Sequence, residues 1–332
     1  MYIKAATLDD LLHRVFERLL RVKKGVNPTR GPVKEIMGAT LRLTNPRARL
    51  SKTEAKGTVF SCLGELLWYL SGSNKLDFIS YYIKRYIDDS EDNKTIYGAY
   101  GPRIFDFDGI NQLENLINTL RGGSTSRRAV IQLFSAKDLS EPRKKEIPCT
   151  CTIQFMARRG KLYTVAHMRS NDAYYGLPHD IFAFSMLQEI IARMLSLEIG
   201  DYVHLVGNIH LYDKRINDAR KYLDEGWQST NASMPVMPIG DPWQSIKKVL
   251  RAEKAIRTGK EVKSQDLELE PYWMDLVRLL EIFRHYKDNS TKDIQKLKKE
   301  IHHPIYLSYI KSRKRQKKQA SLEQTTLDYT RE

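Results

Sequence analysis

Hydrophobic and polar positions alternate with two different periods along the first third of the chain. Apolar residues recur three and four positions apart over about residues 7–23, which predicts an amphipathic helix. A loop bearing NPTRGP follows, and the alternating GATLRL that comes next predicts a strand. The nearly continuous apolar run TVFSCLGELLWYLSG predicts a buried helix, and the tyrosine-rich DFISYYIKRYI predicts a second helix.

The middle of the chain reads mainly as strands around one long helix. SRRAVIQLFS predicts a strand entered from an arginine-bearing loop, and CTIQFMARRGKLYTVAHMRS predicts two strands joined by a turn at residues 159–161. A turn is expected at residues 176–178. The segment DIFAFSMLQEIIARMLSL is apolar nearly all round, which predicts a buried helix from residue 180, and GDYVHLVGNIHLY predicts a further strand.

After about residue 235 the pattern changes to charged amphipathic helices, in DPWQSIKKVLRAEKAI and PYWMDLVRLLEIFRHYKDN. Helices and strands mixed in this order predict an α/β or α+β architecture. We expect a catalytic core over residues 1–235, a helical C-terminal elaboration packed on it over 236–305, and a basic, flexible tail over 306–332.

Composition narrows the class of protein. With 332 residues, of which 29% are charged and 41% hydrophobic, the chain is typical of a soluble protein of one or two domains. No apolar run approaches the roughly 20 residues of a membrane-spanning helix. The N-terminal helix carries Asp9, Asp10 and Glu17 and does not resemble a signal peptide. We therefore expect a cytoplasmic location and no membrane contact.

The formal net charge of +15 indicates anionic partners, either nucleic acid or anionic small molecules. Part of this charge lies in KSRKRQKKQ, residues 311–319. That segment is interpreted either as a solvated, mobile C-terminus or as a tether for nucleic acid or a partner protein, and both interpretations stay open.

The three cysteines are Cys62, Cys149 and Cys151, which are too few for a disulfide framework. Cys149 and Cys151 are two residues apart, so on a strand they would share a face. No second cysteine pair supports a metal site, and no metal is expected.

Cys149 follows a proline at the start of a predicted strand, and arginines are available to surround it: Arg30, Arg127, Arg128 and Arg169. Positive charge near a thiol favours the nucleophilic thiolate, and the same guanidinium groups bind phosphate through charge-assisted hydrogen bonds. The combination predicts a nucleophile that acts on a phosphorylated small molecule.

Several motifs, in order, resemble the thymidylate synthase superfamily. They are GELLWYLSG, YGAYGPRIF, SRR, PCTCTIQF, RSND, the Gly-Leu-Pro turn and the final HLY, and they run from about Arg30 to Tyr212. The resemblance implies a mixed β-sheet packed by helices, with the sheet forming the interface of a homodimer. It also implies 5,10-methylenetetrahydrofolate as co-substrate of a pyrimidine nucleotide.

The resemblance assigns roles to matching positions. Cys149 would attack C6 of the pyrimidine, Glu65 would organise water and proton transfer, and Tyr100 would assist proton removal at C5. The nucleotide would be bound by Arg30, Arg169 and Ser170 at the phosphate, by His210 and Tyr212 at the 3′-hydroxyl, by Gln154, and by Arg127 and Arg128 of the other subunit. The folate would lie against Asp172, Tyr86 and Gly176.

Asp180 departs from the family, which has asparagine after Gly-Leu-Pro-x. An amide complements O4 and N3–H of uracil together, whereas an ionised carboxylate offers acceptors only and suits the N4 amino group of cytosine, with N3 protonated or contacted through water. This aspartate resembles the deoxycytidylate hydroxymethylase branch. Aspartate is also a preferred N-cap residue, but asparagine caps equally well, so capping alone does not explain the change.

A second group of departures from the family affects how far water is excluded from the reaction. The family's two tryptophans are missing from YYIKRYIDDSEDNKTIYG, where Tyr86 and Asp89 lie near their places, and the chain ends in TTLDYTRE instead of a short apolar terminus. Both changes favour access of water to the carbon atom that the folate transfers to C5 of the pyrimidine. Thr150 and His179 also replace the usual histidine and phenylalanine, which alters the pocket.

The resemblance, together with these departures, implies a homodimeric deoxycytidylate 5-hydroxymethyltransferase, an enzyme that suits a virus, such as a phage, or a host that modifies its DNA precursors. The alternatives are a thymidylate synthase acting on dUMP and a hydroxymethylase of dUMP or CMP. Ser170 matches the deoxynucleotide members. An alternative of another class is a nucleic-acid-binding or scaffold protein that reuses the fold.

Overall fold

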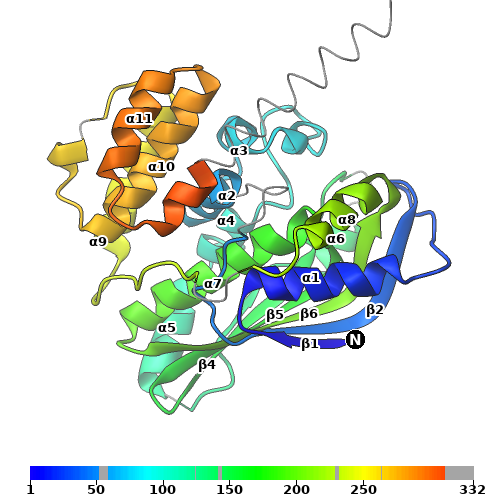
Figure 1. Cartoon of the computed structure of the whole chain (residues 1–332). Helices are drawn as coiled ribbons and strands as arrows, with labels where there is room; N and C mark the ends of the chain where they lie inside the picture. Colours follow the sequence, from blue (N-terminus) through cyan, green and yellow to red (C-terminus); the bar gives the residue numbers. More distant parts are fainter. Residues whose placement is uncertain (52–58, 124, 141–143, 229–231, 263, 311–332) are drawn as a thin grey trace, which may run out of the picture.

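The computed structural model describes residues 1–51, 59–123, 125–140, 144–228, 232–262 and 264–310. These residues form a six-stranded mixed sheet in the order β1-β2-β6-β5-β4-β3, with α1 and α7 packed over one face (Figure 1). The pairs β1/β2 and β5/β6 are parallel and the other pairs are antiparallel. The predicted fold class, a mixed sheet packed by helices, is confirmed.

Strands and helices are interspersed along the chain, and all six strands belong to the one sheet. The strands are β1 (Tyr2–Ala5), β2 (Val33–Leu43), β3 (Val130–Gln132), β4 (Thr150–Arg158), β5 (Lys161–Asp172) and β6 (Glu198–Tyr212). The α-helices are α1 (Leu8–Leu20), α2 (Val59–Leu70), α3 (Leu76–Tyr82), α4 (Tyr100–Phe105), α5 (Gln112–Gly122), α6 (Lys137–Ser140), α7 (Gly176–Met194), α8 (Ile216–Asp224), α9 (Trp243–Arg257), α10 (Pro271–Lys287) and α11 (Thr291–Glu300). Short 3₁₀ helices are η1 (Lys84–Ile87), η2 (Asp213–Arg215) and η3 (Ser264–Leu267). None of the helices in these ranges is long and apolar enough to cross a membrane.

The boundaries of α1 and β2 differ from those that the hydrophobic pattern predicts, and β1 lies in residues for which no strand is predicted. The side chain of Thr7 accepts a hydrogen bond from the backbone N–H of Asp10 and so begins α1 one residue after the predicted start. Strand β2 begins at Val33, five residues before the predicted GATLRL, because Val33 already pairs with Tyr212 of β6. Tertiary pairing therefore extends a strand through residues whose local pattern is weak.

The predicted hairpin is confirmed. Strands β4 and β5 pair out to Arg158 and Lys161, and the two residues between them, Arg159 and Gly160, both have positive φ angles of 50° and 72°. Positive φ at both central residues is the signature of a two-residue hairpin turn whose twist matches that of the strands.

Helix α7 corrects two predictions. It begins at Gly176, four residues before the predicted start, so residues 176–178 form its first turn and not a separate turn. Pro178 is compatible with this position, because backbone N–H groups of a first helical turn have no intrahelical acceptor. Asp180 therefore lies inside the helix, only 9% exposed, and the interpretation of Asp180 as an N-cap residue is wrong.

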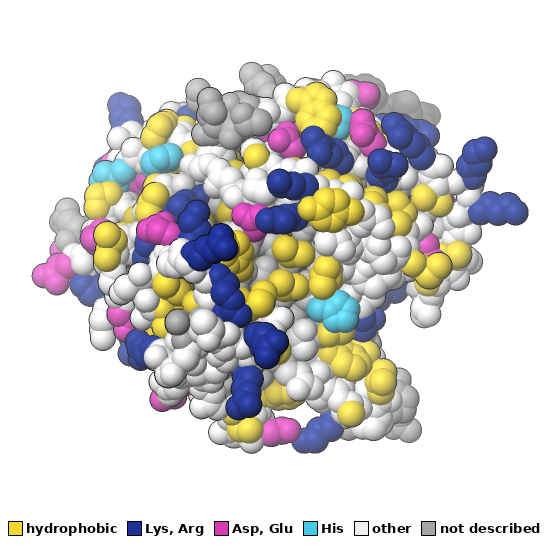
Figure 2. All heavy atoms as spheres, turned by 90° about the horizontal axis from the view of Figure 1, so that it is seen from below, with side chains coloured by type: hydrophobic (Ala, Val, Ile, Leu, Met, Phe, Trp, Pro, Cys, Tyr) yellow, Lys and Arg dark blue, Asp and Glu magenta, His cyan; other side chains and the backbone are white. Residues whose placement is uncertain are grey.

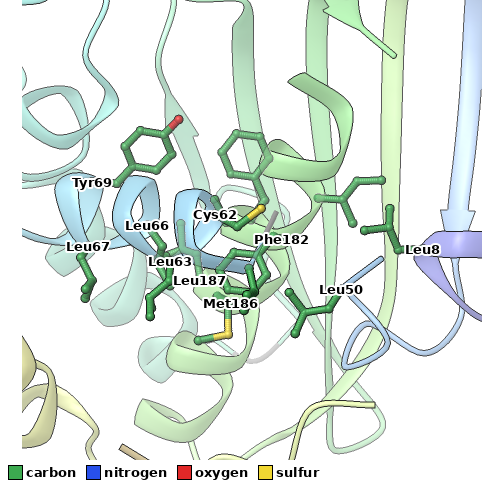
Figure 3. Packing of buried hydrophobic residues seen from close by; sticks show 14 of the residues in the cluster. Leu8, Leu50, Cys62, Leu63, Leu66, Leu67, Tyr69, Phe182, Met186 and Leu187 are labelled. Carbon is green, nitrogen blue, oxygen red and sulfur yellow. The ribbon is translucent and has the colours of Figure 1, made fainter. Parts of the chain in front are cut away.

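The prediction that α2 and α7 are buried helices is confirmed, and they pack on each other. Leu63 and Leu66 of α2 lie against Phe182, Met186 and Leu187 of α7 in the core above the sheet (Figure 3). All five side chains are at most 4% exposed. This contact fixes the two helices that carry the candidate residues Glu65 and Asp180.

Helices α9 to α11 lie on the far side of α2 from the sheet (Figure 1). Phe60 of α2 stacks on Phe283 of α10 with ring centroids 5.7 Å apart, and the Tyr82 hydroxyl donates a 2.9 Å hydrogen bond to Glu253 of α9. Tyr306, buried completely, shows that packing continues into the first residues of the segment predicted as a tail, through residue 310. The predicted basic segment 311–319 lies outside the described residues.

Candidate active site

A pocket of about 1040 Å³ opens where the ends of β5 and β6 meet α2, α7 and the segment around η1. It gathers most of the residues that the sequence predicted for catalysis and binding: Arg30, Glu65, Tyr86, Tyr100, Cys149, Arg169, Ser170, Asp172, Gly176, Asp180, His210 and Tyr212. These residues come from segments up to 182 positions apart in the chain (Arg30 to Tyr212), so only the fold brings them together.

Cys149 lies immediately before β4, and of the three cysteines it alone lines the pocket. The register of β4 against β5 shifts between Thr150 and Thr152, so the two-residue spacing does not bring Cys151 into the pocket. Burial, with the nearby Glu146 carboxylate adding to it, raises the pKa of the Cys149 thiol to about 12. Arg169 opposes this effect, with Nη2 3.7 Å from Sγ. No group of three or more metal-binding side chains is present in the described ranges.

Tyr100 is coupled to the residue after the nucleophile. Its hydroxyl accepts hydrogen bonds from the backbone N–H of Thr150, at 3.1 Å, and from Thr150 Oγ1, at 3.0 Å. Burial, Asp180 and Cys149 together raise the pKa of Tyr100, so its hydroxyl keeps its proton at neutral pH. Thr150 thus has a clear structural role: it orients Tyr100 with the phenolic proton free to point into the pocket.

Arg30 and Arg169 mark the electropositive end of the pocket. Arg30 Nη2 contacts Asp89 at 3.1 Å and Glu146 at 3.0 Å, and it donates to the carbonyl of Lys145 at 2.9 Å. Arg169 donates to the carbonyls of the segment that precedes Cys149. Two guanidinium groups beside a partly open pocket form a site suited to a phosphate, which would compete with the two carboxylates for Arg30.

Glu65 and Tyr86 meet in the wall of the pocket. The Tyr86 hydroxyl donates a 2.5 Å hydrogen bond to Glu65 Oε1, and the Tyr86 ring packs edge-on against Trp68 with centroids 5.4 Å apart. Burial and the Glu65 carboxylate raise the pKa of Tyr86. Tyr86 therefore brings a polar hydroxyl group into the wall of the pocket, next to the Glu65 carboxylate.

Asp172 is the last residue of β5, and only one of its two carboxylate oxygens accepts hydrogen bonds from the described residues. Its Oδ1 accepts hydrogen bonds from the backbone N–H groups of Tyr174 and Tyr175, which fixes the side chain. Its Oδ2 is buried and has no hydrogen-bond partner among the described residues, although Arg85 Nη1 lies 3.8 Å away. A fixed, desolvated acceptor of this kind suits an N–H-rich heterocycle such as a pterin.

Asp180 projects from the second turn of α7 into the pocket. Its Oδ2 accepts a 2.7 Å hydrogen bond from Nδ2 of the buried Asn171. Burial first, and the negative charge of Glu65 second, raise the pKa of Asp180 well above the ordinary range. The raised pKa favours the protonated form of this carboxyl group, which can donate to a ring nitrogen.

His210 and Tyr212 occupy the end of β6, with ring planes nearly perpendicular and centroids 5.2 Å apart. Burial lowers the pKa of His210, which keeps the imidazole neutral at pH 7. His179 joins α7 to α2: its Nδ1 donates to the carbonyl of Tyr175 and its Nε2 lies 2.9 Å from Ser61 Oγ.

Three of the predicted residues do not line this pocket: Arg127, Arg128 and Gln154. Both arginines are exposed just before β3 at the edge of the sheet. Gln154 Nε2 donates to the carbonyl of Arg127 at 2.9 Å, so the glutamine holds the loop that carries the arginines. Within one chain they are separate from the nucleophile.

The pocket also contains residues for which the sequence motifs predict no role. Glu146 precedes the nucleophile by three residues and contacts Arg30, Asn171 contacts Asp180, and Arg85 lies beside Asp172. A charged or amide side chain within or beside a motif is the only local signal of these residues. Asn171 belongs to the RSND motif, and its contact with Asp180 depends on a helix that begins five residues later.

A comparison with models of known protein families matches residues 9–273 of the chain to the family described as thymidylate synthase. The matched range covers most of the 332 residues and includes every residue that lines the pocket.

Proposed function

Because the chain belongs to the thymidylate synthase family, whose members modify C5 of pyrimidine nucleotides with methylenetetrahydrofolate, we propose that it hydroxymethylates dCMP. The chain is thus a folate-dependent one-carbon transferase of nucleotide biosynthesis. In the proposed reaction, dCMP, 5,10-methylenetetrahydrofolate and water give 5-hydroxymethyl-dCMP and tetrahydrofolate.

The observation that carries the choice of base is the buried Asp180 carboxyl group in the same pocket as Cys149. With its proton on one oxygen, this group donates to N3 of cytosine and accepts from the N4 amino group. Uracil offers a carbonyl where cytosine has the amine, so it would face the oxygen that already accepts from Asn171. A buried polar mismatch of this kind discriminates strongly between substrates.

The reaction steps follow from the side chains around the base. Cys149 forms a bond to C6 and loses its thiol proton, and C5 then bonds to the one-carbon unit. Removal of the C5 proton is assisted by Tyr100, whose hydroxyl is held by Thr150. Tetrahydrofolate leaves, water adds its oxygen to the exocyclic carbon and loses a proton near Glu65, and elimination of Cys149 restores the ring.

Addition of water is favoured by the wall formed by Tyr86 and Asp89. The Tyr86 hydroxyl is hydrogen-bonded to Glu65, and Asp89 is paired with Arg30 at the pocket edge. Two polar side chains thus lie where apolar rings would exclude solvent from the reactive carbon. A water molecule bound between them and Glu65 would be positioned to attack before hydride transfer from the folate.

The deciding assay offers dCMP and dUMP separately, each tritiated at C5, with methylenetetrahydrofolate. We expect tritium release from dCMP, without the absorbance change that accompanies dihydrofolate formation. Dihydrofolate made from dUMP would show that the chain is a thymidylate synthase. Tritium release from dUMP without dihydrofolate would make it a dUMP hydroxymethylase.

We further propose that the enzyme is a homodimer that pairs through the open face of the sheet. Burial alternates along β5, so one face is covered by helices and the other is not. In the view from the side of the sheet, hydrophobic side chains are interspersed with lysines and arginines (Figure 2). Met37 of β2 is 77% exposed and Val130 of β3 is 38% exposed. In this arrangement Arg127 and Arg128 reach the phosphate site of the other subunit.

Subunit mixing tests the shared site. The double variant Arg127→Ala/Arg128→Ala and the single variant Cys149→Ser should each be nearly inactive. After denaturation and renaturation together, about one quarter of wild-type activity should return, because half of the dimers are mixed and each has one complete site. Mixtures that stay inactive while mixed dimers form would place both arginines in their own subunit's site or outside any site.

We propose the same division of the chain that the sequence suggested. Residues 1–235 carry the pocket, and residues 236–305 brace α2 through contacts such as Phe60 with Phe283. Residues 306–310 pack with the helical part, and the basic segment after them would contribute to contact with nucleic acid or another protein without taking part in catalysis.

A further inference from the structure

We propose that Tyr202 and His204, two buried residues of β6, fix the direction of a hydrogen-bond chain that ends on Asp180 and so act as positioning residues for recognition of the base. The inference rests on the proposed function, because it assumes that Asp180 contacts the pyrimidine. Neither residue lines the pocket.

The chain of contacts is continuous. Tyr202 Oη lies 2.7 Å from His204 Nδ1, His204 Nε2 lies 3.0 Å from Asn171 Oδ1, and Asn171 Nδ2 lies 2.7 Å from Asp180 Oδ2. Tyr202 and His204 are completely buried, and Asn171 is 3% exposed. Each polar group along this line is therefore satisfied by its neighbours in the chain and not by bulk water.

Two arrangements of the protons are chemically possible, because burial lowers the pKa of His204 to about 3 and leaves its ring with a single N–H. With the proton on Nε2, His204 donates to Asn171 Oδ1, and the Asn171 amide donates to Asp180. With the proton on Nδ1, the ring donates to Tyr202 instead. Asn171 must then turn its amide towards Nε2 and present its carbonyl oxygen to Asp180.

Tyr202 decides between the two arrangements. Its hydroxyl has His204 as its one hydrogen-bond partner among the described residues. In the first arrangement the hydroxyl proton is donated to Nδ1. In the second it has no acceptor in a fully buried site, which is strongly unfavourable. Tyr202 therefore selects the arrangement in which Asn171 donates to Asp180.

This direction matters for the substrate. With Asn171 donating, Asp180 Oδ2 is kept as an acceptor, and any proton on the carboxyl group lies on Oδ1. An acceptor at Oδ2 matches an amino group of the base and opposes a carbonyl. Gly176 leaves room for the arrangement, since a Cβ atom there would lie 2.9 Å from Asn171 Nδ2.

The test is Tyr202→Phe, which removes the hydroxyl and keeps the ring. We expect the ratio of kcat/KM for dCMP to kcat/KM for dUMP to fall about tenfold, the size of effect typical of one buried hydrogen bond. The matched control is Tyr222→Phe, because Tyr222 is also buried and its hydroxyl donates to Asp9 at 2.6 Å, away from the pocket. The control should lose stability but keep the wild-type ratio.

The outcomes separate this inference from the proposed function. A wild-type enzyme that prefers dUMP overturns the proposed function. A wild-type enzyme that prefers dCMP, with a Tyr202→Phe ratio within about twofold of it, overturns the inference. Nitrogen-15 NMR of histidine-labelled wild-type protein, with the His204 signal assigned by its loss in His204→Gln, gives a second readout. An Nε2–H tautomer supports the inference, and an Nδ1–H tautomer overturns it whatever the substrate.

Discussion

Replacing Asp180 with asparagine is expected to move the preference of the enzyme from dCMP to dUMP while the fold is retained. The asparagine amide supplies a donor for O4 and an acceptor for N3–H of uracil, and it lacks the proton that a carboxyl group can give to N3 of cytosine. The ratio of kcat/KM for dCMP to that for dUMP should fall by about a thousandfold or more, as for other sites that read a base or side chain by buried hydrogen bonds.

Stability should fall by no more than about 3 kcal/mol in this variant, because the new amide keeps the shape of the carboxyl group but turns a donor towards the Asn171 amide that donates to Asp180 Oδ2. A matched control is Asp9→Asn, which alters another buried carboxylate that accepts hydrogen bonds from Ser51 and Tyr222 outside the pocket. Steady-state kinetics with both nucleotides and a thermal melt of each variant check the prediction. An Asp180→Asn enzyme that still prefers dCMP would show that another group selects the base.

The hydrophobic pattern was sufficient for those elements whose burial is decided locally. The β4–β5 hairpin was predicted from alternation and from Gly160, whose positive φ the turn requires. The apolar residues of helix α7 predict the helix but place its start four residues too late, because Pro178 is equally typical of a turn. A proline in a first helical turn and a proline in a loop give the same local signal.

Only those residues of the candidate site that belong to sequence motifs could be predicted from the sequence. Cys149 and Arg169 belong to short motifs and both line the pocket. The contacts of Asn171 with His204, and of Glu146 with Arg30, join residues 33 and 116 positions apart. Such pairs depend on strand register and loop packing, and a single sequence carries no local signal of either.

The second large effect is expected for Cys149→Ser. Turnover should fall by at least about a thousandfold, because a serine hydroxyl is a much weaker nucleophile than a thiolate and Arg169, which lies 3.7 Å from the sulfur, is a cation that cannot take the hydroxyl proton. Binding of dCMP should change less than about threefold, since the sulfur bonds to the substrate only after the nucleotide is bound.

Alkylation of the wild-type enzyme, with Cys149→Ser as the control, tests the pKa of the Cys149 thiol. Burial and Glu146 raise the pKa of Cys149 to about 12, so at pH 7 the empty pocket holds a protonated thiol, and iodoacetamide should alkylate it slowly and faster as the pH rises. Mass spectrometry of the modified peptide follows this reaction, with Cys149→Ser as the blank.

Calorimetric titration with dCMP and tritium release measure binding and turnover in the Cys149→Ser variant. If the serine enzyme kept more than about one per cent of wild-type turnover, attack on C6 would have to come from another group, and the assignment of Cys149 would be wrong.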